Sequence, residues 1–245
     1  MSDAQVGFSQ RLRLEWLDAA AFMFRDGKSP QEIDAALLDL LSDRVSVGTT
    51  AVRGTIHKAV TILLKIWVTI PPDLTPLRDD AIAFLDTLPA GDRLTLHWGL
   101  SMAAYPFFAA VAAHVGRLLR LQGSTAYPQI LRRVCEQYGQ RDTVTRAARR
   151  IIRTLVDWGA LADSEEPGIY VAAPLRKVHD AALVAWLTEA TLRASGSRSA
   201  GLAVLYSHPA LFPFEVKAAP QAALARSPRL EVFRQSLDEE VVALR

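Results

Sequence analysis

Apolar residues recur at spacings of three and four along most of this chain, a pattern that predicts amphipathic helices. Residues 29–32 read Ser-Pro-Gln-Glu, which supplies a serine cap, a proline in the first turn and a glutamate that can close a capping box. In the first half the spacing predicts helices over residues 10–25, 30–41, 50–68, 79–88, 93–104 and 106–121. We therefore expect residues 1–122 to form an N-terminal helical bundle.

After residue 122 the pattern mixes helical and strand-like segments. It predicts a helix over residues 127–138 that ends at Gly139, and a second helix that begins at Asp142 or Thr143 and stops at Trp158. Residues 161–171 then read as strand, polar turn and strand. Helix, short turn, basic helix and hairpin follow one another in winged helix-turn-helix domains, so we assign residues 123–174 to such a domain.

The last third of the chain predicts an extension with mixed secondary structure. A helix is expected over residues 178–194, and residues 202–206 are either a strand or a short helix. Apolar residues 230–234 and 241–244 flank a polar stretch, which predicts a terminal β-hairpin, although the same residues could form a helix. The predicted fold is thus mainly α, and residues 175–245 form a C-terminal extension with a few short strands.

The helix predicted from residue 142 has two opposite faces. At about 100° per residue, one face is apolar and carries Val144, Ala148, Ile151, Ile152 and Leu155. The opposite face is basic and carries Arg146, Arg149, Arg150 and Arg153. Like charges at this spacing repel one another, and a polyanion is the simplest ligand that offsets the repulsion. Within the helix, we expect Asp157 to pair with Arg153 and expect no acidic partner for the other three.

Charge is concentrated around this helix. The whole chain has 245 residues and a net charge of only +2, with half of its residues hydrophobic, so a normal folded core is expected. Residues 116–156 alone hold nine arginines against two acidic residues, a net charge of +7, which leaves the remainder acidic. A basic segment inside an acidic protein is typical of nucleic-acid contact.

These observations define a predicted DNA-binding surface. The second helix would enter a major groove, where arginines bind guanine edges or phosphates and the threonines near its start meet the backbone. The preceding helix would contribute two further arginines, unless these are ordinary surface residues. The predicted contacts are Arg141, Thr143, Thr145, Arg146, Arg149, Arg150, Arg153, Arg132 and Arg133.

Two other segments bear on this surface. The tip of the predicted hairpin carries Glu165 and Glu166, so we expect this wing to point away from DNA or to meet a protein. The helix pair over residues 30–68 also resembles a helix-turn-helix, and its second helix offers Arg53, Lys58 and Lys65 as a possible second DNA contact.

Other kinds of chemistry find little support in the sequence. The five histidines show no metal-binding spacing, Cys135 is the only cysteine, and no nucleotide-binding or nucleophile motif is present. We therefore expect no metal, no cofactor and no catalysis. His97 and His114 are expected to be hydrogen-bonded packing residues, and Cys135 a buried one. The apolar run over residues 98–113 is short for a membrane span and predicts a core helix in a cytoplasmic protein.

Two resemblances support this interpretation. Residues 124–173 resemble a winged helix-turn-helix domain. The layout of the whole chain, whose basic helix-turn-helix ends in Leu-Val-Asp-Trp-Gly-Ala-Leu (residues 155–161), is similar to the BrxA family of bacteriophage exclusion. That resemblance implies a small, helical, non-enzymatic accessory that binds DNA beside larger enzymes of a phage-defence locus. The hairpin and the C-terminal extension depart from the family's plan.

The sequence thus favours a non-enzymatic protein that binds double-stranded DNA, as a regulator of transcription or as an accessory of an antiviral defence system. Other proteins of such a complex would contact the acidic wing or the C-terminal extension. Two alternatives stay open. The winged helix could dock a protein partner through its arginines, or it could bind RNA, although no basic stretch with interleaved aromatic residues is visible.

Overall fold

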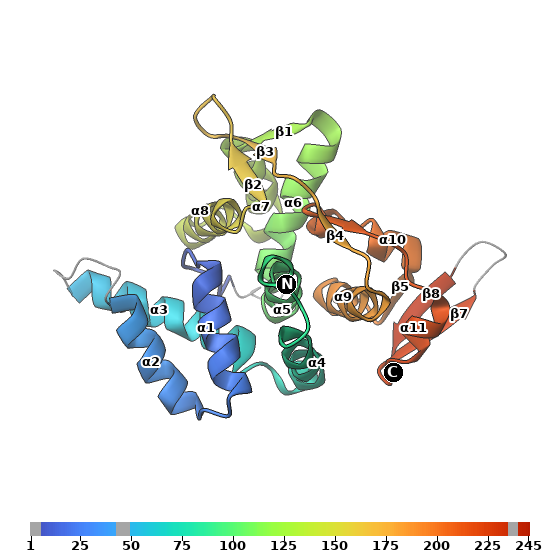
Figure 1. The fold of residues 1–245 in the computed structure, drawn as a ribbon. Helices are drawn as coiled ribbons and strands as arrows, with labels where there is room; N and C mark the ends of the chain where they lie inside the picture. The colour runs from blue at the N-terminus through green and yellow to red at the C-terminus, as the bar shows by residue number, and fades with distance from the viewer. Residues whose placement is uncertain (1–5, 43–49, 235–239) are drawn as a thin grey trace.

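The computed structural model describes residues 6–42, 50–234 and 240–245, without the side chains of residues 50–53. The described part of the chain is mostly helical, with eleven α-helices, three short 3₁₀ helices and eight strands of three to five residues. The expectation of a mainly α protein with a few short strands is therefore confirmed (Figure 1).

Six helices form the first half of the chain. Ser29 and Glu32 form the expected capping box, in which the Glu32 carboxylate accepts from the backbone N–H of Ser29 at 2.7 Å. The helix predicted over residues 79–88 lies at 75–85 instead, because Pro76 is tolerated in a first turn. The helices are α1 (Leu14–Arg25), α2 (Pro30–Ser42), α3 (Thr50–Trp67), α4 (Thr75–Leu85), α5 (Leu94–Ala104) and α6 (Pro106–Gln122).

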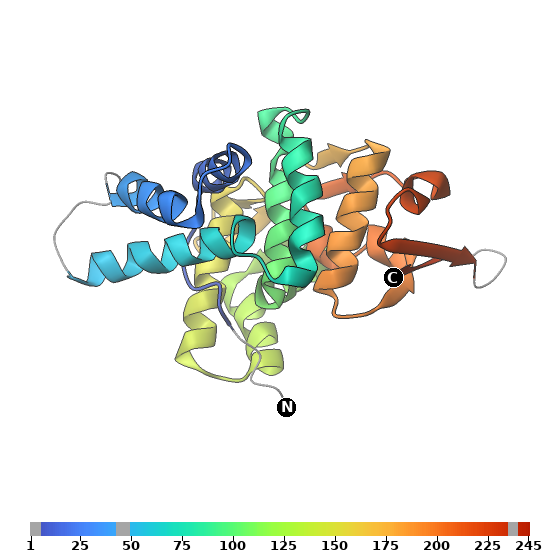
Figure 2. The ribbon, with the colours of Figure 1, turned by 90° about the horizontal axis from the view of Figure 1, so that it is seen from below.

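Helix α5 is the centre of the molecule, with α1 to α3 on one side and α9 (Ala181–Ala194) on the other (Figures 1 and 2). It is buried on nearly every side, as expected for the apolar run. The Trp98 ring of α5 meets the rings of Trp158, Phe212 and Phe214 at centroid distances of 5.6–6.0 Å. One hydrophobic core therefore runs through all three predicted segments and does not stop at residues 122 and 174.

The middle of the chain forms a compact group of two helices and three strands. Strand β1 (Ser124–Ala126), which the sequence did not predict, leads into α7 (Tyr127–Tyr138) and α8 (Asp142–Asp157). The predicted hairpin is confirmed as β2 (Leu161–Asp163) and β3 (Ile169–Ala172). The sheet is antiparallel in the order β1-β3-β2, with Thr125 opposite Tyr170.

The C-terminal third is built around α9. The predicted start of this helix at residue 178 is wrong, because β4 (Arg176–Val178) instead pairs in parallel with β6 (Phe214–Val216), and the Asp180 side chain caps the helix by accepting from Leu183 N–H at 2.8 Å. The segment over residues 202–206 is the helix α10 (Leu202–Tyr206). The remaining elements are β5 (Ser199–Gly201), α11 (Gln221–Ala225), β7 (Leu230–Arg234) and β8 (Glu240–Leu244).

The predicted terminal hairpin is also confirmed. Strands β7 and β8 pair antiparallel, with Val232 opposite Val242, and β5 adds to the other edge of β8. This sheet covers a second, smaller core with α9, α10 and α11 that includes Leu192, Leu205 and Leu230.

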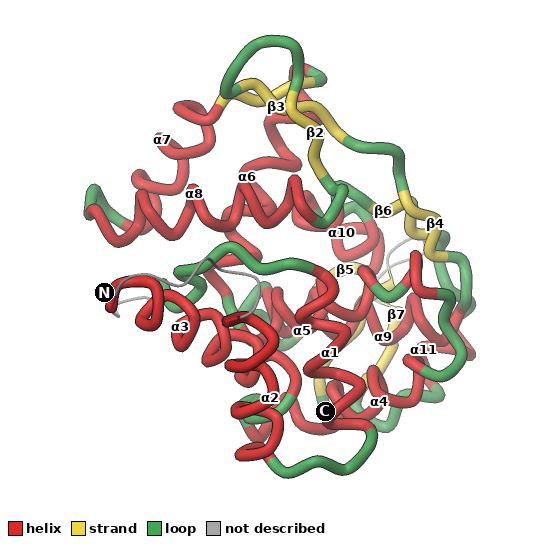
Figure 3. The backbone as a smooth tube through the Cα atoms, turned by 60° about the vertical axis from the view of Figure 1, so that its left-hand side comes forward, coloured by secondary structure: helices red, strands yellow, loops and turns green. Residues whose placement is uncertain are grey.

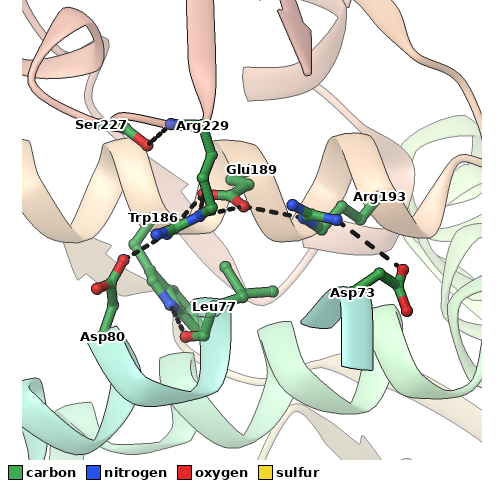
Figure 4. A network of polar contacts seen from close by, with 8 residues as sticks. All are labelled: Asp73, Leu77, Asp80, Trp186, Glu189, Arg193, Ser227 and Arg229. Atoms are coloured by element: carbon green, nitrogen blue, oxygen red, sulfur yellow. Dashed lines mark hydrogen bonds and ion pairs between the residues drawn. The ribbon is translucent and has the colours of Figure 1, made fainter. Parts of the chain in front are cut away.

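A buried ionic network attaches this C-terminal unit to the bundle (Figure 4). The Glu189 side chain of α9 is only 1% exposed and accepts from Arg193 Nε and from Arg229 Nε, each at 2.9 Å. Arg229 also donates to Asp80 of α4. Beside the network, Trp186 Nε1 donates to the Leu77 carbonyl at 2.8 Å. These contacts connect α4, α9 and the loop before β7.

No single helix among the described residues has both the length and the apolar character that a bilayer crossing requires. Two helix pairs reach that length together, but each is bent at its break, by 53° in one pair and by 117° between α5 and α6.

The His97 side chain of α5 is enclosed in the core and hydrogen-bonded at both nitrogens, as expected. Trp67 Nε1 donates to His97 Nδ1 at 3.1 Å, and an indole N–H can only donate, so Nδ1 is the unprotonated nitrogen. His97 Nε2 then carries the proton and donates to Asp18 Oδ1 at 3.1 Å. Burial lowers the pKa of His97, because a second proton would place a charge in the core and remove the Trp67 bond.

Acid should therefore destabilise the fold as the pH falls below 6.5, the ordinary pKa of histidine. Burial lowers the pKa values of His114 and His208 as well, so below that pH the unfolded chain binds protons that the folded chain excludes. We expect a lower melting temperature at pH 5 than at pH 7.5. The decline should be shallower for His97→Gln, whose amide cannot take up the proton. An equal decline in both proteins would assign the acid sensitivity to other groups.

Candidate nucleic-acid interface

Helix α8 has the two faces that its sequence predicts. Val144, Ala148, Ile151, Ile152 and Leu155 are all buried, together with Ala147 and Thr154. Arg146, Arg149 and Arg150 are exposed on the opposite side. Figure 3 shows α7 and α8 next to each other, with β2 and β3 at one end of the pair. The burial of the apolar face fixes the orientation of the helix and directs its arginines to solvent.

The three exposed arginines differ in their contacts. The expectation that Arg146 has no acidic partner is wrong. Its Nη2 lies 3.9 Å from the Asp142 carboxylate one turn earlier, at the start of the helix. The Arg149 guanidinium lies 5.2 Å from the centre of the Tyr127 ring, which holds it against α7. Arg150 has no hydrogen bond or ion pair with any residue in the described ranges. Its charge is the most available of the three.

Arg153 is engaged by a partner other than the predicted one. Its Nη1 donates to both carboxylate oxygens of Asp163 on β2, at 2.9 and 3.2 Å. Asp157, the predicted partner, instead forms an ion pair with Arg11 of the N-terminal segment. The reason is tertiary, since β2 turns back beside the last turns of α8 and the N-terminal segment crosses the helix end. Arg153 is therefore partly neutralised.

The end of α8 is held by contacts that the sequence did not reveal. The Leu12 backbone N–H donates to Thr154 Oγ1 at 3.1 Å, and Trp158 Nε1 donates to the Leu12 carbonyl at 3.1 Å. Phe8 in the same segment is fully buried against Tyr105 and Phe108. No local pattern signals these contacts, because the two hydrogen bonds join residues more than 140 positions apart and the Phe8 contacts join residues about 100 positions apart.

Helix α7 contributes to the same surface. Arg132 and Arg133 are both exposed, and each donates to the Glu136 carboxylate at 3.1 Å. Two positive charges therefore share one negative charge, which lowers the pKa of Glu136 and leaves a net positive charge on this face. Arg141 Nη2 donates to the Tyr138 carbonyl at 3.3 Å, across the turn between the helices.

An open groove of about 570 Å³ separates α7 from the start of α8. Arg132, Arg141 and Thr145 line it, so the structure brings three predicted contacts together. Thr143 is exposed one position after Asp142. Cys135 also lines the groove. It packs against the core as expected, but it is half-buried and not enclosed.

The acidic side chains at the hairpin tip are exposed to solvent. Glu165 and Glu166 are exposed, and the turn is closed by a hydrogen bond from Ser164 N–H to the Ile169 carbonyl at 3.0 Å. Only Asp163, at the base of the turn, is directed to an arginine of α8.

The two described lysines of the possible second DNA contact on α3 lie in different surroundings. Lys58 is exposed, whereas the Lys65 ammonium lies 4.7 Å from the centre of the Tyr105 ring. The side chain of Arg53 lies outside the described residues. Within the described ranges, no group of three or more histidine, cysteine or acidic side chains could hold a metal ion.

Comparison with protein-family models, with curated proteins and with solved structures finds no significant match to this chain.

Proposed function

We propose that this protein binds double-stranded DNA without catalysis, with α8 as the recognition helix of a winged helix-turn-helix. The proposal assigns β1, α7, α8, β2 and β3 to that domain, an order in which a three-stranded antiparallel sheet closes the end of the helix pair. The observation that carries the proposal is the exposure of Arg146, Arg149 and Arg150 opposite the buried face of α8.

In this proposal, residues at different positions on the surface contact different parts of the DNA. A major groove admits an α-helix, and arginine forms bidentate hydrogen bonds with guanine, so Arg146 and Arg150 are assigned to base edges. Arg149 is held by Tyr127 and is assigned to phosphate. Thr143, Thr145, Arg132, Arg133 and Arg141 surround the helix start and are assigned to the DNA backbone. Arg153 contributes least, because Asp163 already neutralises it.

The likeness in layout to bacteriophage-exclusion proteins suggests the biological setting. We propose a regulator of transcription or an accessory of a phage-defence complex. Glu165 and Glu166 at the exposed hairpin tip would repel phosphate, so the tip is assigned to solvent or to a partner protein. This acidic tip is also the observation that favours the second candidate, a winged helix that docks another protein.

Duplex binding should be strongly salt-dependent. With four to six phosphate contacts, the plot of log affinity against log salt concentration should have a slope of roughly −4 to −5. Fluorescence anisotropy with labelled random duplex DNA, single-stranded DNA and duplex RNA at several salt concentrations measures this slope. Tighter binding of duplex RNA than duplex DNA would favour the RNA alternative. Failure to bind any of the three at low salt would replace the proposal with the protein-docking one.

A further inference from the structure

A small pocket lies between the N-terminal helices and the end of α7. Its walls come from parts of the chain that are distant in sequence: Gly7, Lys65 of α3, residues 104–107 at the bend between α5 and α6, and Tyr138 at the last position of α7. The pocket has a volume of about 210 Å³, and most of its lining is apolar. It is separate from the groove between α7 and α8.

Aromatic rings form much of the wall. The Phe107 and Tyr138 rings meet edge to face, with their centroids 4.9 Å apart, and Tyr105 is 4% exposed. Burial raises the pKa values of Tyr105 and Tyr138, so both phenols stay neutral at physiological pH. Tyr105 and Phe107 are nearly covered by their neighbours, so the half-buried Tyr138 ring and the exposed Pro106 are the surfaces left for a planar ligand, with no negative charge.

Lys65 supplies the one charge among the residues that line the pocket. Its ammonium lies 4.7 Å from the centre of the Tyr105 ring. Within the described part of the chain no acidic side chain pairs with it. Lys65 is half-buried and lines an otherwise apolar pocket, so an anionic group is the complement that the pocket lacks.

The volume restricts the ligand to a single ring. Pockets for drug-sized ligands usually measure about 300–1,000 Å³, whereas this one measures about 210 Å³. We propose that it binds a small aromatic carboxylate, with the ring against Pro106 and Tyr138 and the carboxylate paired with Lys65. The inference does not rest on the proposed DNA binding, and its test does not involve DNA.

Isothermal titration calorimetry of the full chain with benzoate tests the proposal. We expect a Kd of about 1 mM or tighter, as suits a ligand with few atoms. Benzyl alcohol, which lacks the charge, should bind at least tenfold more weakly. The variant Lys65→Met should lose at least tenfold in benzoate affinity and should bind benzyl alcohol as the parent does. Lys58→Met, an exposed lysine of the same helix outside the pocket, should change neither.

A second variant locates the ligand. Ala104 lines the pocket, so Ala104→Leu should fill part of it and abolish benzoate binding while the melting temperature confirms that the chain is folded. Full benzoate binding by folded Ala104→Leu would place the ligand elsewhere and overturn the proposal. So would equal benzoate affinity in the parent and Lys65→Met, or no binding to the parent at about 10 mM benzoate, tenfold above the expected Kd.

Discussion

Replacing both Arg146 and Arg150 with alanine is expected to weaken duplex DNA binding by about 2–6 kcal/mol, because each bidentate contact with guanine contributes about 1–3 kcal/mol. The two side chains lie one turn apart on the exposed face of α8. Anisotropy titration of the double variant and the parent at one salt concentration measures the difference. The loss should be smaller for non-cognate DNA, where the arginines contact phosphate alone.

The controls for this experiment separate binding from folding. The Arg146 side chain is 75% exposed and its pair with Asp142 is on the surface, so the double variant should melt within a few degrees of the parent. Lys58→Ala on α3 should bind DNA nearly as the parent does. If Lys58→Ala loses more affinity than the double variant, α3 is the DNA-contacting helix and the assignment of α8 is wrong.

Replacing Glu189 with alanine is expected to destabilise the fold by about 3–5 kcal/mol, the usual cost of removing one partner from a buried ion pair. Glu189 is the shared acceptor of Arg193 and Arg229, which are themselves only 15% and 19% exposed (Figure 4). Without Glu189, both guanidinium groups stay largely buried and each keeps only one acidic partner, Asp73 for Arg193 and Asp80 for Arg229, to offset its lost hydration. Urea unfolding followed by circular dichroism measures the change.

Asp73→Ala is the matched control for the network. Asp73 lies 4.0 Å from Arg193 but is 73% exposed, so its removal should cost at most about 1 kcal/mol. If Glu189→Ala and Asp73→Ala destabilise equally, the network does not attach the C-terminal unit to α4. In that case the apolar contacts around Trp186 and Leu192 hold it.

The predicted elements were most accurate where the pattern was local and strong. Helix α7 begins and ends at the predicted residues, since Gly139 stops it with a positive φ of 83°. The β7–β8 hairpin matches within one residue. Errors arose at short elements. Strand β1 has three residues and no visible alternation, and it exists because β3, more than 40 positions later, offers it backbone partners.

For the candidate site, the sequence alone determined that α8 is a helix with an apolar face and an arginine face, because helical periodicity is set by residues three and four apart. Tertiary structure decided which of those arginines remain available. Strand β2 turns back beside α8 and places Asp163 against Arg153. Asp157 pairs with Arg11, which lies 146 positions earlier in the chain. The pocket beside Lys65 likewise exists only after folding, since its walls come from four separate segments. Charge pairing between segments depends on where the core places each backbone, and that placement is not encoded in local spacing.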